Sequence, residues 1–425
     1  MNYLPKNGTD GKLNGKLESK LFELTNSQLL LWTGQELSPE SPLYNMALSF
    51  DIAGAIDVTH FRKAFQLLIS RCDAMRTVFR VVEGTPKQQV LADMEYALEL
   101  IDLSEDEGQE QQLRDWFDDR TQLKFNLSEC LFDAVLIKLS DQRFIWYFNQ
   151  HHLITDAWAV SVQYKAVAKY YQHSVEGSLD EAPSLPVFQD YIDYEKVARA
   201  DPERESERTH WQNKIESFPK PPLLYGFGNQ TSTTLSERIP LDLGVERSAR
   251  LRAIAKESDV RSWTQHLSQF NIFATTLLAY LYRVSGQHQL AFGTPAHNRP
   301  TAAFKETPGV FIEFFPITGE VQETDSFSDL LKRVRVEALE FLRYAQPGSS
   351  SPELNRVFNT VLKYIHASFS DFNEISMTSE WVHPGHCDPR HHFRLQVHDF
   401  DDSGNIQLNF DLNCSVFNEE ARKAA

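Results

Sequence analysis

The sequence has little that would support disulfide bonds or a membrane span. Its 425 residues include only four cysteines, which lie far apart and form no C-x-x-C pair. This usage argues against a disulfide framework and fits a reducing compartment. No stretch approaches the ~18 to 20 apolar residues of a membrane-spanning helix, and the N-terminus lacks the apolar core of a signal peptide. We therefore expect a soluble, cytoplasmic protein with no membrane partner.

Basic residues are also scarce. Lys and Arg number 42 against 59 Asp and Glu, which gives a formal charge of −17. Such a field repels phosphate backbones, so we expect no nucleic-acid partner. The chain contains no G-x-G-x-x-G or Walker loop and no repeat of about 20 to 50 residues. Nucleotide chemistry and solenoid architectures therefore lack support.

The remaining composition is that of a globular protein. Hydrophobic residues make up 41 %, aromatic residues 12 % and charged residues 24 %, and the length predicts two or three domains. Residues 1–20 are rich in Gly, Asn and Lys, which predicts a tail or linker. The acidic, proline-punctuated segment 172–186 is the best candidate for a domain boundary. We therefore expect an N-terminal lobe over 21–180 and a C-terminal lobe over 181–425.

Hydrophobic periodicity gives the clearest local predictions. From Phe61 to Ile69 apolar residues recur at helical spacing, behind a candidate cap at Asp57 or Thr59. Residues 131–139 and 143–150 are strand-like and close enough to form a hairpin. Helices and strands alternate without a strict βαβ rhythm, which predicts an α+β fold. Further expected elements are a short apolar turn at 27–32, strands at 44–52, 77–82, 289–294, 310–317 and 356–365, and helices at 109–120, 246–256, 270–282 and 326–344.

One segment, from Asn149 to Trp158, carries the candidate chemistry. It reads NQHHLITDAW and lies where a predicted strand ends and a predicted helix begins. A neutral histidine can accept a proton from an amine or a hydroxyl at cellular pH, or orient that nucleophile. The alternative is a structural His pair beside a helix cap at Thr155 or Asp156. The residue pattern alone leaves both interpretations open.

At this point the sequence resembles the condensation domains of nonribosomal peptide synthetases. These belong to the chloramphenicol-acetyltransferase-like superfamily, whose mark is His-His-x-x-x-Asp-Gly. The resemblance covers nearly the whole chain, and its motifs agree in order and spacing. They are 27–32, 71–79 with Arg76, Thr77 and Phe79, the pair His151-His152 with Asp156, 188–191, 292–295 with Arg299-Pro300, and 308–316.

The resemblance implies two chloramphenicol-acetyltransferase-like lobes in a V shape with a central tunnel. It implies a condensation-type acyltransferase, which joins a carrier-protein-bound acyl thioester to an amine or hydroxyl nucleophile in nonribosomal peptide or hybrid polyketide biosynthesis. Its partners would be acyl or peptidyl carrier proteins as donors, and also as acceptors where the nucleophile is carrier-bound. The domain itself would need no cofactor and no metal, because phosphopantetheine arrives on the carriers.

The resemblance also implies roles for single residues. His152 would act at the reacting centre and His151 would support its loop. Asp156 would be structural and would form a buried ion pair with Arg299.

Three further residues stand at positions that we expect near the tunnel. Ala157 replaces the family's usual glycine, and Glu313 stands where asparagine is common. Both are candidate tunnel-lining residues, together with Trp158. For Trp158, packing in the core is the alternative.

Two other functions remain open at this stage. A superfamily acyltransferase that uses acyl-coenzyme A would share the catalytic motif. An inactive domain of the same fold could serve as a recruitment platform, and the departures at Ala157 and Glu313 keep this hypothesis open.

The C-terminal part of the sequence holds seven candidate metal ligands. They are His383, His386, Cys387, Asp388, His391, His392 and His398. Residues 393–397 alternate as strands do, which sends successive side chains to opposite faces. We therefore expect a loop and a strand rather than a zinc site. The pattern ends after a strand-like segment without a terminal helix, which favours an excised domain.

Overall fold

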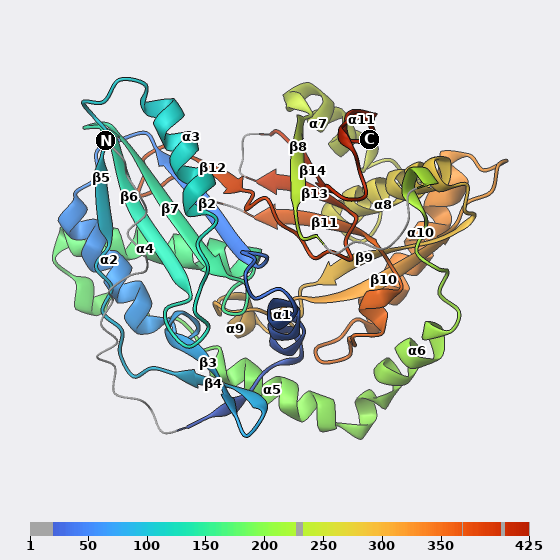
Figure 1. The fold of residues 1–425 in the computed structure, drawn as a ribbon, viewed down its shortest axis with the longest axis horizontal. Helices are drawn as coiled ribbons and strands as arrows, with labels where there is room; N and C mark the ends of the chain where they lie inside the picture. Colours follow the sequence, from blue (N-terminus) through green and yellow to red (C-terminus); the bar gives the residue numbers. More distant parts are fainter. Residues whose placement is uncertain (1–19, 227–232, 368, 401–403, 425) are drawn as a thin grey trace. The chain divides into compact units, whose positions relative to one another are not determined.

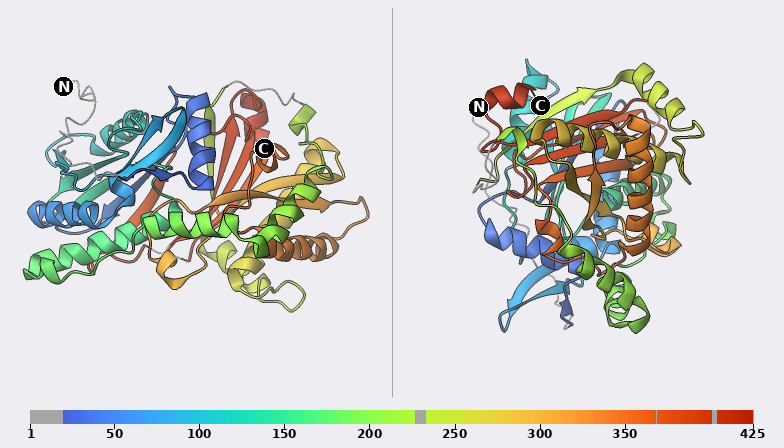
Figure 2. Two further views of the ribbon diagram at one scale, coloured as in Figure 1. Left: turned by 90° about the horizontal axis from the view of Figure 1, so that it is seen from below. Right: turned by 90° about the vertical axis from the view of Figure 1, so that its right-hand side faces the viewer.

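The computed structural model describes residues 20–226, 233–367, 369–400 and 404–424, and it divides into two compact units (Figures 1 and 2). The first unit contains the chain up to Tyr194 together with Arg299–Phe311 and Phe369–Pro384. The second contains Glu195–Asn298, Ile312–Ser368 and the chain from Gly385 onward. Two segments from the second half of the sequence therefore belong to the first unit.

The first unit is built on a five-stranded sheet of order β12-β2-β7-β6-β5, beside a small sheet of order β1-β4-β3. Strand β12, from late in the chain, pairs antiparallel with β2 (Figure 1). The elements are β1 (Phe22–Glu23), α1 (Asn26–Leu37), β2 (Asn45–Ile52), α2 (Val58–Arg71), η1 (Ala74–Arg76), β3 (Thr77–Val82), β4 (Thr85–Val90), β5 (Glu99–Asp102), α3 (Gln109–Arg120), β6 (Phe132–Ser140), β7 (Arg143–His151), α4 (Ala157–Glu176), η2 (Leu179–Glu181), α9 (Ala302–Lys305) and β12 (Met377–Val382).

Aromatic side chains fill both faces of this five-stranded sheet. On one face Trp146 of β7 packs against Phe61 of α2 and Tyr164 of α4, with ring centroids 5.4 and 6.1 Å away. On the other face the ring of Tyr147 stacks on Phe117 of α3. Side chains alternate between faces along a strand, so neighbours 146 and 147 serve opposite layers. Strand β7 is therefore held rigidly from both sides.

The second unit has one six-stranded sheet of order β10-β9-β11-β13-β14-β8. Helices α8 and α10 bury an apolar stripe against one face of it (Figure 2). Its elements are η3 (Pro202–Arg204), α6 (Glu205–Ile215), η4 (Leu224–Gly226), β8 (Ser236–Asp242), α7 (Gly244–Ile254), α8 (Gln265–Ser285), β9 (Gln289–Ala296), β10 (Glu313–Glu320), α10 (Phe327–Tyr344), η5 (Leu354–Arg356), β11 (Thr360–Ala367), β13 (Phe393–Phe400), β14 (Gln407–Asn413) and α11 (Glu419–Ala424). Helix α5 (Gln189–Ala200) begins in the first unit and continues into the second.

The α+β class is confirmed, and so are the hairpin β6–β7 and the cap at Asp57. Two local predictions are wrong. The expected turn at 27–32 is the 12-residue helix α1, which a capping box at Thr25 and Gln28 starts. A terminal helix, α11, does follow β14, and Asn418 caps it through the Ala421 N–H. The V-shaped arrangement and the tunnel stay predictions.

The division into units differs from the contiguous lobes 21–180 and 181–425. The segment 172–186 stays in the first unit because the Pro183 carbonyl accepts hydrogen bonds from Tyr170 at 2.8 Å and from Arg71 at 3.0 Å. The predicted tail at 1–20 lies outside the described residues, apart from Lys20. Among the helices that the structure describes, none is both long and apolar enough to cross a bilayer.

Gly309 is a position where the fold needs glycine. Its φ is +146°, and a Cβ there would overlap the ring of Phe188. We predict that Gly309→Ala lowers the free energy of unfolding by more than the matched change Gly177→Ala. Gly177 also has positive φ, but open space surrounds it, so alanine there costs only the ~1 to 2 kcal/mol of left-handed strain. Urea unfolding of both variants measures the difference, and equal losses would contradict the steric argument.

Candidate active site

The HHxxxD segment forms the connection between strand β7 and helix α4. His151 is the last residue of β7, and Ala157 is the first of α4. The backbone N–H of His151 donates to the Leu131 carbonyl, and that of His152 donates to the Tyr44 carbonyl, both at 2.8 Å. These bonds continue the sheet through both histidines. The connection therefore inherits the rigidity of the sheet.

His151 is an internal support of the loop. Its side chain is buried, Nδ1 accepts the Leu153 N–H at 3.2 Å, and Nε2 lies 3.2 Å from Oε1 of Gln35. Since an amide oxygen only accepts, Nε2 carries the ring hydrogen and the ring is neutral. Burial, reinforced by the nearby His152, lowers the pKa of His151 to about 3. The ring therefore stays neutral throughout the physiological range.

His152 has a different environment. Its side chain is only partly buried, and Nδ1 lies 2.7 Å from the backbone carbonyl of Thr155. A carbonyl can only accept, so Nδ1 carries the hydrogen in the neutral ring. The lone pair is then on Nε2. His152 therefore presents a proton acceptor whose tautomer is set by the loop itself.

Asp156 connects the loop to α4 and to a distant part of the sequence. As the N-cap of α4, it accepts the Ala159 N–H at 2.8 Å through Oδ1. Its two oxygens lie 2.9 and 3.1 Å from Nη2 of Arg299, and Oδ2 also accepts the Phe311 N–H at 3.0 Å. Both charged side chains are at least 97 % buried. The expected buried ion pair is present.

Arg299 in turn organises its own segment. Nη1 donates to the carbonyls of Phe304 and Thr307, both at 2.6 Å, and the guanidinium lies 3.8 Å from the ring centroid of Phe311. Burial lowers the pKa of Arg299, while the charge of Asp156 opposes that shift. One arginine thus folds the segment 299–311 around itself and fixes it to the start of α4.

The three candidate tunnel-lining residues differ in their surroundings. Ala157 is partly buried, and Trp158 is 37 % exposed with its Nε1 donating to the Lys305 carbonyl at 2.7 Å. Trp158 is thus not a fully buried core residue. Glu313 is buried, and its carboxylate accepts hydrogen bonds from Asn298, Gly348 and Ser350. This carboxylate holds the short segment 346–350 in the second unit.

Helix α1 contributes two supports that the sequence analysis did not identify. Gln28 donates to the Leu153 carbonyl at 3.2 Å, and Gln35 contacts Nε2 of His151. The two glutamines are seven residues apart and therefore lie on the same face of a helix. The capping box T-x-x-Q at Thr25 was a readable helix start. This signal could have predicted the helix, but it could not have predicted the contacts that Gln28 and Gln35 make.

Asp73, in the second family motif, is also structural. Its carboxylate accepts the N–H groups of Ala74, Phe188 and Gln189 at 2.8 to 3.0 Å. Burial raises the pKa of Asp73, and these backbone donors oppose the rise. The carboxylate therefore links the motif at 71–79 to the one at 188–191.

The histidines near the C-terminal end of the chain hold separate polar partners. His386 contacts Thr234, His392 contacts Asn359, and His398 contacts both Gln396 and Asn409. These imidazoles satisfy neighbouring hydroxyl and amide groups within the second unit. The prediction that this sequence cluster holds no zinc stays a prediction.

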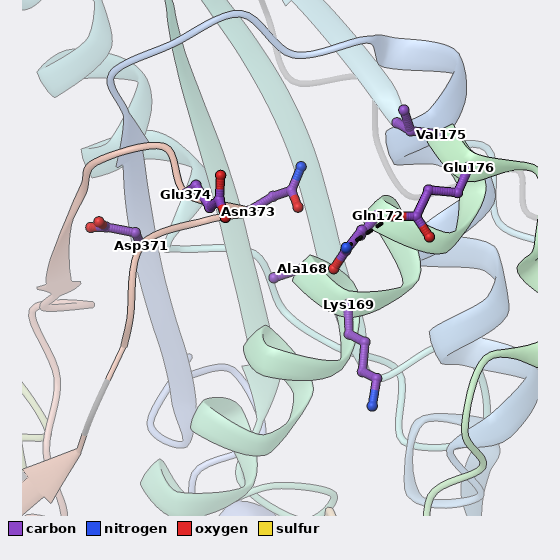
Figure 3. Close-up of a pocket in the computed structure, with 8 residues that line it drawn as sticks. All are labelled: Ala168, Lys169, Gln172, Val175, Glu176, Asp371, Asn373 and Glu374. Atoms are coloured by element: carbon purple, nitrogen blue, oxygen red, sulfur yellow. Dashed lines mark hydrogen bonds between the residues drawn. The ribbon is translucent and has the colours of Figure 1, made fainter.

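The first unit also contains a cavity of about 460 Å³ beside the C-terminal half of α4 (Figure 3). The turn at 371–374 faces the helix across it. Its charged lining residues are Lys169, Glu176, Asp371 and Glu374. Lys169 lies twelve positions along α4 from Ala157, about 18 Å at 1.5 Å per residue. We assign this cavity no part in the chemistry of the histidine loop.

We predict a large loss of stability when either Asp156 or Arg299 is removed from the buried ion pair. A buried charge left without its partner typically costs ~3 to 5 kcal/mol. We expect Asp156→Asn and Arg299→Ala each to lower the free energy of unfolding by this order, and the double variant to lose less than the sum. Urea unfolding measures all three. Strict additivity would mean that the pair is not coupled.

The burial of His151 predicts that the free energy of unfolding depends on pH, with a defined sign. Its folded-state pKa of about 3 lies below the unfolded value of ~6.5, so below pH ~6.5 the unfolded state binds more protons. The contribution of the neutral His151 to the free energy of unfolding is therefore fully present above pH ~6.5. It falls as the pH decreases, by up to ~1.4 kcal/mol per pH unit.

We expect His151→Gln to lose less stability on acidification than the wild type does. His391 and His398 also have lowered pKa values. Only the difference between the two proteins, measured by urea unfolding at several pH values, therefore reports on His151. Parallel pH profiles would contradict a neutral, buried ring.

Comparison with known sequences agrees with the resemblance that the motifs indicate. The family profile described as Condensation domain matches residues 18–424. The chain is 24 % identical over 417 residues to Surfactin synthase subunit 1 of Bacillus subtilis strain 168, covering 95 % of this chain and 11 % of that protein. It is 21 % identical over 413 residues to a dimodular nonribosomal peptide synthase of the same organism, covering 94 % and 17 %. The chain therefore spans only a small part of these relatives.

Solved structures share the fold. The first condensation domain of the CDA synthetase superposes with a TM-score of 0.83 at 19 % identity, covering 96 % of this chain and 94 % of that one. A starter condensation domain of rhizomide synthetase, a mutant in complex with C8-CoA and Leu-SNAC, gives 0.82 at 20 % identity, covering 96 % and 92 %. The expected chloramphenicol-acetyltransferase-like fold is confirmed. Since the family profile covers almost the whole sequence, this chain belongs to the condensation domain family.

Proposed function

We propose that this chain is a condensation-type acyltransferase that joins a carrier-bound acyl thioester to an amine or hydroxyl nucleophile. The observation that carries the proposal is the distance of 2.7 Å between Nδ1 of His152 and the Thr155 carbonyl, from which we infer that the hydrogen of the neutral ring is on Nδ1. The remaining lone pair on Nε2 can accept a proton or orient an N–H or O–H group. The neighbouring His151 is neutral, so it places no second charge beside the reacting ring.

The proposed reaction is an acyl transfer at a thioester carbonyl. The acceptor nitrogen or oxygen forms a bond to the carbonyl carbon while its proton passes to Nε2 of His152. The carbon–sulfur bond then breaks, and the departing sulfur takes up that proton as a thiol. His152 returns to its starting state, and the product is an amide or an ester. No oxidant, reductant or metal ion enters this balance.

Carrier proteins are the proposed partners. The similar proteins include a nonribosomal peptide synthase, which supports an acyl or peptidyl donor held on a phosphopantetheine arm. The starter domain of rhizomide synthetase, which has a similar fold, was solved in complex with C8-CoA and Leu-SNAC. This complex supports thioesters as ligands of this fold. We propose a carrier-bound donor, and an acceptor that is either small or carrier-bound.

Free acyl-coenzyme A is the rival donor, and the complex of the rhizomide starter domain with C8-CoA favours it. An inactive platform is the other alternative. The intact His151, His152 and Asp156, all three held by hydrogen bonds, argue against it.

We predict that His152→Ala lowers turnover by ~10² to 10⁴-fold while the melting temperature changes little. The side chain is only partly buried, so its removal leaves no large cavity. Intact-mass spectrometry of a loaded donor carrier, mixed with the protein and candidate amines and alcohols, measures turnover.

A matched control is His173→Ala, which removes a partly buried histidine at the opposite end of α4. We expect this variant to keep wild-type turnover. Near-wild-type turnover of His152→Ala would refute the assignment of the reacting centre.

The donor can be tested by presenting one acyl group in two forms. A docked carrier supplies its arm at high effective concentration, so the site needs little affinity for a free thioester. We predict that the carrier-bound donor reacts at least ~10²-fold faster than the same acyl-coenzyme A at equal concentration. The rates come from the same mass-spectrometric assay.

Salt provides a second readout in that assay. The charge of −17 opposes long-range attraction of an acidic carrier. Moderate salt should therefore leave the carrier-dependent rate unchanged or raise it. Equal or better use of acyl-coenzyme A would favour the rival donor.

A further inference from the structure

Three potential metal ligands converge in the second unit. They are His266 of α8, His366 of β11 and Asp399 of β13, and their ligand atoms all lie within 4.8 Å of one another. None belongs to the set of seven candidate ligands that the sequence shows between 383 and 398. Residues 266 and 399 are far apart in the chain, so no local spacing could have indicated this grouping.

The secondary structure fixes all three positions. Strands β11 and β13 run parallel, and His366 is the direct cross-strand partner of Asp399, so both side chains leave the same face of the sheet. His266 lies in the first turn of α8, which Thr264 caps by accepting the Leu267 N–H. The site is thus built on one helix and two strands rather than on loops.

The two imidazoles face each other closely. Their ring centroids are 4.0 Å apart with an interplanar angle of 32°, and both side chains are exposed. The neutral imidazole is the form of histidine that binds a metal ion.

Asp399 is oriented by two further groups. Arg252 donates to Oδ1 at 2.7 Å, and the hydroxyl of Tyr364 donates to Oδ2 at 3.0 Å. The distance of 3.9 Å between Oδ2 and Nδ1 of His366 is too long for a direct hydrogen bond. The carboxylate is therefore held in place by its outer partners and not by the histidine.

We propose that His266, His366 and Asp399 bind a divalent transition metal ion, with Zn²⁺ as the best fit. Two imidazole nitrogens and one carboxylate oxygen suit zinc, which binds such ligands at ~2.0 to 2.2 Å. Mg²⁺ and Ca²⁺ prefer all-oxygen sites. The two exposed rings can close on the ion by small side-chain rotations, and water completes the coordination.

The charges nearby set the expected strength of binding. Asp399 attracts a cation, whereas Arg252 and the positive end of the α8 dipole oppose it. We therefore expect reversible binding, which a chelator can undo. Because the ion would tie the start of α8 to β11 and β13, its effect should be on stability. This proposal does not depend on the proposed acyl transfer.

The test uses the untagged full chain after treatment with a chelator. Isothermal titration with Zn²⁺ should give one tight site per chain, and the melting temperature should rise with added Zn²⁺ because the ion binds only the folded state. Mg²⁺ should produce neither effect. Loading with Co²⁺ should give the visible absorption of a protein-bound ion.

Variants locate the site. His266→Gln and His366→Gln should each abolish the tight site and the thermal shift, and Tyr364→Phe should weaken binding ~10- to 100-fold by freeing the carboxylate. His173→Gln, which changes a histidine of the first unit, should bind like the wild type. Circular dichroism and the melting temperature without metal establish that each variant folds.

Two results would overturn the proposal. One is the absence of saturable Zn²⁺ binding by the wild-type chain. The other is Zn²⁺ binding that folded His266→Gln and His366→Gln retain, which would place the ion at other histidines.

Discussion

The buried pair of Asp156 and Arg299 is the interaction on which the candidate site depends. One carboxylate caps α4, receives the guanidinium and accepts the Phe311 N–H, so it satisfies three separate structural demands. The arginine closes the segment 299–311 through Nη1, which donates to two backbone carbonyls. An ion pair with so many neutral partners can offset its desolvation, which an isolated buried pair often does not. Its contribution is to bring a segment from the second half of the sequence to the start of α4.

The histidines gain distinct properties from consecutive positions. His151 is the buried last residue of β7, whereas His152 lies in the turn that follows and is only partly buried, so two identical side chains meet different environments. His151 is neutral because it is buried, and both its nitrogens are bound, to Gln35 and Leu153. His152 binds the loop through Nδ1, at the Thr155 carbonyl. In this motif the supporting histidine and the candidate reactive histidine are therefore adjacent residues.

Sequence reasoning predicted those features that depend on local pattern or on family motifs. The helical stripe from Phe61 to Ile69, the hairpin β6–β7 and the pairing of Asp156 with Arg299 all follow from such signals. Strand β12 could not be predicted, because its partner β2 lies far earlier in the chain and only that pairing makes the segment a strand. The support from Gln28 and Gln35 was missed for a related reason. A buried polar residue becomes meaningful only when its distant acceptor is known.

The structure also bears on the two departures that kept an inactive platform open. Ala157 is the first residue of α4 and has ordinary helical geometry, so the position does not need the conformational freedom of glycine. Alanine is the best helix former, and its methyl group costs nothing in helical backbone geometry. Glu313 uses its carboxylate to hold the backbone N–H groups of Gly348 and Ser350. Both substitutions thus have structural explanations, and neither removes a group from the histidine loop. These two departures therefore give no evidence, within the histidine loop, that the domain is inactive.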